Sequence, residues 1–122
     1  MIRYQDLTSG YRIAEITSDS EMINTPEDML DIMADAGYNG CSGLIIYENN
    51  LNRDFFDLKT GLAGEILQKF SNYRMQLAVV GNFLNIESKS LRDFIWESNN
   101  MGRICFVASL EMESSSGSLQ SD

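Results

Sequence analysis

The fold is decided by residues 25–47, TPEDMLDIMADAGYNGCSGLIIY, which join the start of a helix to a continuously apolar strand. Thr25 suits the N-cap and Pro26 the first helical position, and two acids favour the first turn. An apolar stripe then leads to Gly37, which we expect to end the helix in a left-handed conformation. The run Leu44-Ile45-Ile46-Tyr47 lacks polar alternation, which is typical of a heavily buried parallel strand.

The alternation of helix and apolar strand recurs towards the C-terminus. Apolar runs at residues 77–81 and 104–108 predict two further buried strands, and helical spacing of apolar residues predicts helices over 62–70 and 91–95. Asp54 or Asp57 is expected to cap the first of these helices, and Ser88 or Ser90 the second. Gly102 is expected to end the second helix. We therefore expect the apolar strands to pair in parallel through right-handed crossovers. Their lack of polar residues implies that both faces of the sheet are covered, or at least heavily buried.

The N-terminal residues predict a hairpin, with strands in 2–7 and 11–16 around a turn that contains Gly10. The whole chain is therefore an α/β protein of order β-β-α-β-α-β-α-β, with a mixed, mostly parallel sheet of about five strands. We expect a single domain over residues 1–110. Residues 111–122 are rich in serine and acids and predict a flexible tail.

Charge and missing residue types exclude several classes of function. The chain has 122 residues, with 18 Asp and Glu against nine Lys and Arg, a net charge of −9 and no histidine. Nucleic acids and anionic membranes are not expected partners, because binding to them needs a basic surface. A basic protein partner fits the charge better. Without histidine, Ser-His-Asp and Cys-His sites cannot be built, and no cofactor is predicted.

Cysteine usage and the N-terminus indicate a cytoplasmic protein. Cys105 lies in an apolar run and is expected in the core, whereas Cys41 lies in a glycine-rich turn and is expected to be exposed. One disulfide between them is an alternative, but reduced thiols are the default. The N-terminus lacks a signal-peptide pattern, and no apolar run approaches the ~20 residues that span a membrane.

Two short motifs resemble a small bacterial family, domain of unknown function 4180. They are Ile66-Leu67-Gln68-Lys69-Phe70 and Glu97-Ser98-Asn99-Asn100, the second followed closely by Gly102, and the stretch 54–67 is also similar to that family. The resemblance covers about residues 10–109 by element order. It implies no particular function. Members carry a further C-terminal helical segment, in whose place this chain has its serine-rich tail.

The element order also resembles the STAS fold of sulfate transporters and anti-sigma-factor antagonists. There, a turn similar to Asp-Ser-Ser-Gly-Leu opens a helix, and phosphorylation of its serine switches partner binding. The nearest stretch here is Phe56-Asp57-Leu58-Lys59-Thr60-Gly61-Leu62, which needs a one-residue insertion and offers Thr60 instead of serine. The resemblance implies a regulatory switch at Thr60. The alternative is that Thr60 only forms local hydrogen bonds at the start of the helix.

The main candidate site consists of residues in the connection between the strand at 44–47 and the following helix. Asp54, Asp57, Lys59 and Thr60 are candidates for a partner-binding or switch surface, and Glu48 is a weaker one. Open α/β sheets place ligands at the carboxyl ends of their strands, where this connection begins. The acids could instead hold a divalent cation, or simply cap a helix and solvate a loop. Further weak candidates are Trp96, expected to be partly exposed, and Asn99 and Asn100, whose structural role at a helix end is preferred.

These observations predict a non-enzymatic, cytoplasmic protein-interaction or regulatory module, with residues 48–64 as its contact surface. A small enzyme or ligand-binding domain with an acidic divalent-metal site is the alternative. An acidic inhibitor that mimics nucleic acid is a third hypothesis, which requires the negative charge to gather on one face. The sequence identifies neither the partner nor the oligomeric state.

Overall fold

The structure is a computed structural model that describes residues 2–109. The segment 111–122, predicted to be a flexible tail, lies outside the described residues. The described elements are β1 (Ile2–Asp6), β2 (Arg12–Ile16), α1 (Pro26–Tyr38), β3 (Gly43–Tyr47), α2 (Leu62–Tyr73), β4 (Gln76–Val80), α3 (Lys89–Met101) and β5 (Ile104–Val107). Short 3-10 helices η1 (Glu48–Asn50), η2 (Arg53–Phe56) and η3 (Leu58–Thr60) form the connection from β3 to α2. The predicted α/β class and element order are confirmed.

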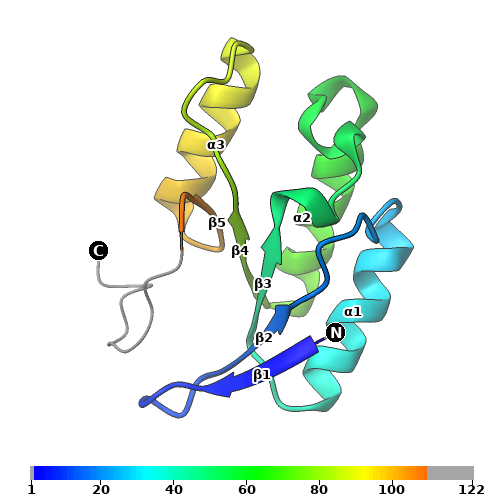
Figure 1. The fold of residues 1–122 in the computed structure, drawn as a ribbon, viewed down its shortest axis with the longest axis vertical. Coiled ribbons are helices and arrows are strands. Elements are labelled where there is room, and N and C mark those ends of the chain that lie inside the picture. The colour runs from blue at the N-terminus through cyan, green and yellow to red at the C-terminus, as the bar shows by residue number, and fades with distance from the viewer. Residues whose placement is uncertain (1, 110–122) are drawn as a thin grey trace.

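The strands follow one another across the sheet in sequence order, from β1 to β5 (Figure 1). β1 pairs antiparallel with β2, and every later neighbouring pair is parallel. The predicted mixed, mostly parallel sheet is therefore confirmed. Because the order increases in one direction, right-handed crossovers place all their helices on the same face.

The main core lies on that helix-covered face. Buried side chains from α1, α2 and α3, among them Met29, Phe70 and Ile95, pack in one cluster with alternate strand residues such as Leu44 and Val79. Burial of these side chains contributes roughly 1.5–3 kcal/mol each. None of the helices within residues 2–109 has the length and hydrophobicity of a membrane-spanning segment.

The opposite face of the sheet is heavily buried without a helix from the described part of the chain. Its cluster consists of Ile13, Ile45, Ala78 and Val80, against which Tyr11, Tyr47 and Val107 pack. The prediction of heavy burial thus holds, although a second helical layer is not what produces it in residues 2–109. Tyr47 and Val107 of the strands, together with Tyr11 directly before β2, pack over these apolar neighbours.

A polar network borders this second cluster. The buried Glu15 carboxylate pairs with Arg3 at 2.8 Å and accepts a hydrogen bond from the Tyr47 hydroxyl at 2.6 Å. Burial, followed by the hydrogen bond to Glu15, raises the pKa of Tyr47 to about 12. The phenol therefore remains a donor throughout the physiological range.

Asn99 closes the outer edge of β5, the last strand of the sheet. Its side-chain amide donates to the carbonyl oxygen of Phe106 at 3.2 Å, and its Oδ1 accepts from the Phe106 N–H at 2.7 Å. A single side chain thus satisfies backbone groups that a neighbouring strand would otherwise bind. Unpaired strand edges promote association between chains, so this contact also protects the edge. Asn100 is exposed.

Several predicted helix ends are confirmed, and others are wrong. The confirmed ones are Thr25 and Ser88 as N-caps and Gly102 as the left-handed C-cap of α3. Neither Asp54 nor Asp57 caps α2, whose N-cap is Gly61 with a φ of 81°. Gly37 does not end α1, which continues to Tyr38 before Gly40 adopts the left-handed conformation at a φ of 82°.

The two cysteines exchange their expected environments. Cys41 is buried, whereas Cys105 is partly exposed on the face without helices, and both thiols are free. Cys41 is covered because its turn folds back against α1, where its N–H donates to the Ala36 carbonyl at 2.9 Å. Burial raises the pKa of both thiols, which makes them less reactive at neutral pH.

Candidate interaction cleft

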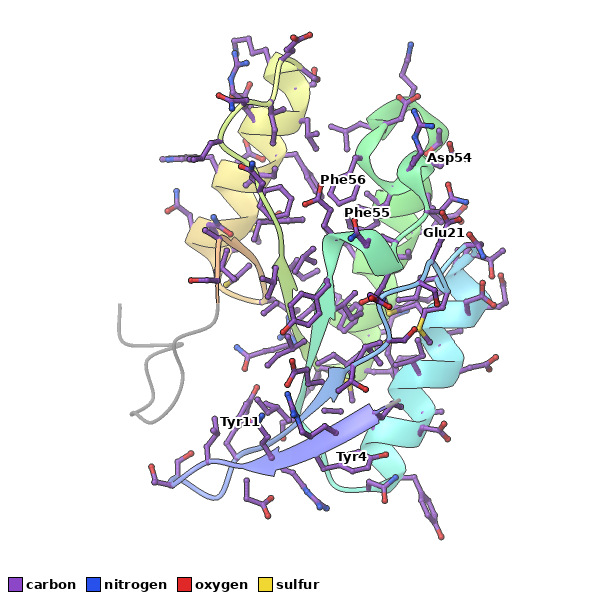
Figure 2. All side chains as sticks on the ribbon, in the orientation of Figure 1. Tyr4, Tyr11, Glu21, Asp54, Phe55 and Phe56 are labelled. Carbon is purple, nitrogen blue, oxygen red and sulfur yellow. The ribbon has the colours of Figure 1, made fainter. Side chains whose placement is uncertain are left out.

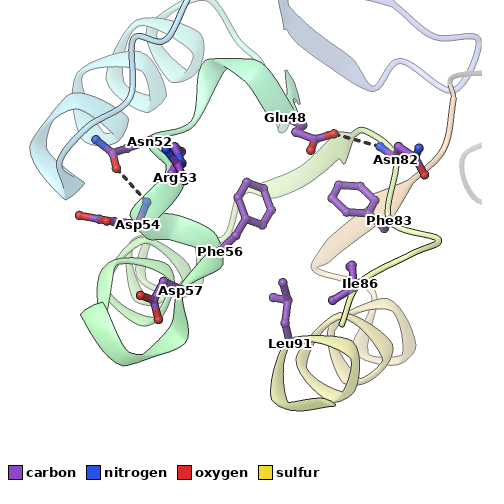
Figure 3. A pocket seen from close by; sticks show the side chains of 10 residues that line it. All are labelled: Glu48, Asn52, Arg53, Asp54, Phe56, Asp57, Asn82, Phe83, Ile86 and Leu91. Carbon is purple, nitrogen blue, oxygen red and sulfur yellow. Dashed lines mark hydrogen bonds between the residues drawn. The ribbon is translucent and has the colours of Figure 1, made fainter. Parts of the chain in front are cut away.

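A cleft of about 610 Å³ opens between the segment that leads into α2 and the segment that leads into α3 (Figure 3). Both segments lie at the same end of the molecule, at the top of Figure 1, because each follows the carboxyl end of a parallel strand. Ligand sites of open α/β sheets lie beyond this edge, and the volume is within the ordinary range for such sites. The cleft is lined by Glu48, Asn52, Arg53, Asp54, Phe56, Asp57, Asn82, Phe83, Ile86 and Leu91.

The floor of the cleft is apolar. Phe56 and Phe83 come from the two different segments, and their ring centroids lie 6.2 Å apart (Figure 3). Phe56 also packs edge-on against the fully buried Phe55, and Phe83 packs edge-on against Phe106 of β5. Such aromatic pairs add roughly 0.5–1.5 kcal/mol to the effect of area burial. The two half-buried rings are therefore anchored in the core while one side of each faces the cleft.

The rim of the cleft is acidic. It carries the carboxylates of Glu48, Asp54 and Asp57 and one cation, Arg53. Asp54 and Asp57 are exposed, and no hydrogen bond or ion pair within residues 2–109 involves the Asp54 carboxylate. The negative charge of the Asp54 carboxylate is therefore available to a partner.

Glu48, which directly follows β3, is fixed in place by the segment that follows β4. Its Oε1 accepts a hydrogen bond from the Asn82 N–H at 3.0 Å, drawn in Figure 3. Its side chain crosses directly over Gly81, where an added Cβ would collide with Oε1 and lie 2.7 Å from the Glu48 Cβ. Glycine is therefore required at position 81 by close approach. The contact joins the ends of β3 and β4.

Thr60 and Asn52 stabilise the loop that carries the two aspartates. The Thr60 hydroxyl lies 2.6 Å from the carbonyl oxygen of Asp54 and 2.9 Å from that of Asp57, and it accepts from the N–H of Leu62. Asn52 caps η2 by accepting from the Asp54 N–H at 2.8 Å. Phosphorylation would remove the hydroxyl hydrogen that Thr60 donates to these carbonyls. The geometry thus favours the local hydrogen-bonding interpretation of Thr60.

Asn50 holds the cleft segment onto the rest of the fold. Its side chain is fully buried, accepts from the Tyr47 N–H at 2.9 Å, and donates to the carbonyls of Ser18 and Ser20 at 2.8 and 3.0 Å. Its own carbonyl accepts from two amides of the β2–α1 connection, including that of Ile23 at 2.9 Å. The β2–α1 connection is thus paired to the cleft segment.

Some of the residues predicted from sequence meet in the cleft, and others do not. Glu48, Asp54 and Asp57 line it together, whereas Lys59 and Thr60 are exposed nearby but outside its lining. Figure 2 shows Asp54 at the outside of the segment and Phe56 pointing inward. The remaining candidates lie on α3 outside the lining: Trp96 is 67% exposed, Asn99 binds the edge of β5, and Asn100 is exposed.

Sequence reasoning missed the apolar half of the cleft. Phe83 and Ile86 belong to the stretch 81–88, which appears in the sequence as a loop of mixed composition. The rule that connections after neighbouring parallel strands meet at one edge could have placed this stretch opposite 48–61. Within residues 2–109, no group of three or more acidic or cysteine side chains is arranged to hold a metal ion.

One family model matches most of the chain. Residues 8–115 match a family described as a domain of unknown function, DUF4180. The chain belongs to this family. No curated protein and no solved structure matches the chain, so the resemblance to the STAS fold remains a prediction.

In this DUF4180 domain, the two motifs occupy structural positions. Ile66 and Phe70 of the first motif are completely buried on α2, and Ser98 and Asn99 of the second lie near the end of α3. Ser98 is buried and Asn99 binds the free edge of β5. No residue of either motif lines the cleft, and the buried and edge-binding residues of the motifs contribute to the fold.

Proposed function

We propose that this DUF4180 domain is a non-enzymatic, cytoplasmic protein-interaction module, and that the cleft between the segments leading into α2 and α3 is its contact surface. The observation that carries the proposal is the combination of an apolar aromatic floor with an acidic rim in one cleft. Protein interfaces have the same organisation, with a central apolar anchor site and a polar margin.

The floor favours a partner that inserts an apolar side chain. Phe56 and Phe83 are held by the core, so an inserted side chain would meet aromatic surface at little cost in ordering. Removing that side chain from water would supply most of the affinity.

The rim favours a partner with a basic residue next to its apolar one. Asp54 and Asp57 are exposed at the margin, and the whole chain has a net charge of −9. Exposed carboxylates contribute to the association rate and to specificity more than to affinity. Salt should therefore weaken the interaction mainly by slowing association.

The composition supports a binding role rather than a catalytic one. The sequence contains no histidine, the most common general base at neutral pH. Both cysteines within the described residues are free thiols with raised pKa values, which fits a reducing compartment and not nucleophilic catalysis.

Affinity capture with paired variants tests the proposal. The tagged chain is used to isolate partners from host lysate, with Asp54→Asn/Asp57→Asn and Phe83→Ala as the cleft variants. The control, Asp31→Asn/Asp35→Asn, removes two exposed carboxylates from α1 and so matches the change in charge. We expect one stoichiometric partner that the control retains and both cleft variants lose.

Two results would contradict the proposal. A partner retained by both cleft variants would place the contact surface elsewhere. A partner lost equally from the α1 control would mean that total charge, and not the cleft, determines binding. Circular dichroism of each variant shows whether it is folded before its binding is compared.

A further inference from the structure

We propose that a second hollow, at the opposite end of the sheet, binds an oxyanion group, a phosphate or a carboxylate, between Arg74 and Arg103. The hollow has a volume of about 420 Å³, and Tyr11, Ser42 and Gln76 also line it. It lies where α2 and α3 end and β4 begins, and Figure 2 shows Tyr11 far from Phe56 of the cleft. The site is thus separate from the proposed interaction cleft.

The lining of this hollow is basic, although the chain as a whole is acidic. It contains two guanidinium groups and no carboxylate, in a chain with 18 acidic and nine basic residues. Within residues 2–109, neither Arg74 nor Arg103 forms an ion pair. Within the described residues, these two guanidiniums donate only one hydrogen bond, from Arg103 Nη1 to the Met75 carbonyl oxygen at 3.4 Å. Both groups retain donors for an anion, and guanidinium donors match the geometry of carboxylate and phosphate oxygens.

Arg74 occupies a backbone position that would suit glycine better. Its φ is 55°, and it is the only non-glycine residue with a positive φ among residues 2–109. Arg74 follows α2 directly, and its N–H donates to the carbonyl oxygen of Ser71. The next N–H, of Met75, donates to the carbonyl oxygen of Phe70. Glycine is the usual residue in this left-handed position after a helix. A strained residue that faces a hollow is typical of a functional site.

The uncharged wall of the hollow is held by hydrogen bonds. The Tyr11 hydroxyl hydrogen-bonds to the Gln76 side chain and lies 3.3 Å from the Ser42 carbonyl oxygen. Burial raises the pKa of Tyr11, while the charge of Arg103 opposes the rise. The phenol therefore remains neutral and adds no negative charge beside the guanidiniums.

A simpler role for the two arginines predicts a different result. Both follow the C-terminal end of a helix, where a cation interacts favourably with the helix dipole. In that role each arginine would affect stability but not anion binding. Thermal unfolding of the full chain in phosphate separates the two roles. Because phosphate also stabilises proteins in general, only a comparison with the arginine variants reveals a specific site.

The experiment titrates the wild type, Arg74→Gly, Arg103→Gln and the control Lys89→Gln with inorganic phosphate, at ionic strength matched by chloride. Lys89 is exposed and belongs to α3 near the interaction cleft, so its variant loses one positive charge away from the hollow. For the wild type and the control, we expect Tm to rise with the logarithm of the phosphate concentration, and for both arginine variants we expect at least tenfold weaker apparent binding. Arg74→Gly should be at least as stable as the wild type in chloride.

A parallel titration with acetate identifies the anion. A logarithmic rise in Tm with phosphate alone assigns a phosphate group, and the same rise with acetate as well assigns oxyanions in general. The proposal is overturned if the wild type shows only a linear rise, or if either arginine variant responds as the wild type does.

Discussion

Asn50 offers the sharpest test of how the cleft segment is held in place. Its buried side chain connects three parts of the chain, the end of β3, η1 and the β2–α1 connection. Replacing Asn50 with alanine removes three hydrogen bonds at once. It leaves the N–H of Tyr47 and the carbonyls of Ser18 and Ser20 without these partners.

The expected cost follows from that count. Each intramolecular hydrogen bond contributes roughly 1 kcal/mol net, and a buried group left without a partner costs roughly 1–3 kcal/mol. Three bonds therefore give a loss of about 3 kcal/mol for Asn50→Ala. A typical domain is stable by only about 5–15 kcal/mol, so this single side chain should be responsible for a large share of the stability.

Urea unfolding measures this loss. With a slope of about 1.5 kcal/mol per molar urea, the unfolding midpoint of Asn50→Ala should fall by about 2 M. Far-UV circular dichroism is the appropriate probe because Trp96 is 67% exposed and its fluorescence reports poorly on the core. The control is Asn49→Ala, since Asn49 is exposed, and we expect it to change stability by less than about 0.5 kcal/mol. Equal midpoints for Asn50→Ala and the control would refute the reasoning.

Three further predictions concern the strand ends and the polar network. Gly81→Ala should lower the free energy of unfolding by about 1–3 kcal/mol, measured in urea, because its Cβ would collide with Glu48. Asn99→Ala should cost about 1–2 kcal/mol and promote self-association, detected by light scattering, because Phe106 loses two backbone hydrogen bonds at the sheet edge. In a titration followed by ultraviolet absorbance, one phenol should ionise near pH 12 and be missing from Tyr47→Phe. Because the folded state raises this pKa from 10 to about 12, its contribution to stability is complete below pH 10 and is lost as the pH rises to 12.

The two stability predictions each have a matched control variant. Gly64→Ala should not destabilise the protein, because a Cβ at position 64 would meet nothing within 4 Å. Asn100→Ala should leave the sheet edge intact, since Asn100 is exposed next to Asn99. If Gly81→Ala or Asn99→Ala proved as stable as its control, the corresponding contact would contribute nothing. An unchanged high-pH titration in Tyr47→Phe would assign the shifted phenol to another residue.

The fold was predictable because its elements depend on local patterns. Continuous apolar runs such as Leu44–Tyr47 indicated buried parallel strands, and Thr25 and Ser88 indicated helix starts through the hydrogen bonds that they make. The start of α2 agrees with the prediction, but its N-cap was assigned wrongly, because Asn52 and Asp57 cap the short 3-10 helices that precede it. Nothing in the local sequence distinguishes a cap of a 3-10 turn from a cap of an α-helix.

The cleft was only half predictable for a different reason. Glu48, Asp54 and Asp57 belong to one connection, so sequence alone could group them. Phe83 comes from another connection and meets Phe56 only through the register of β3 with β4. The burial of Asn50 likewise depends on a long-range contact with Ser18 and Ser20. Such pairings arise from the tertiary structure and leave no spacing pattern in the chain.

Site-specific photocrosslinking tests the central claim most directly. A benzophenone-bearing phenylalanine analogue replaces Phe83 in the cleft or, as the control, Tyr38, which is 91% exposed at the end of α1. After irradiation in host cells, we predict one covalent adduct with a protein partner from position 83 and none from position 38. An adduct that forms from position 38 and not from position 83 would contradict the assignment of the cleft as the interaction surface.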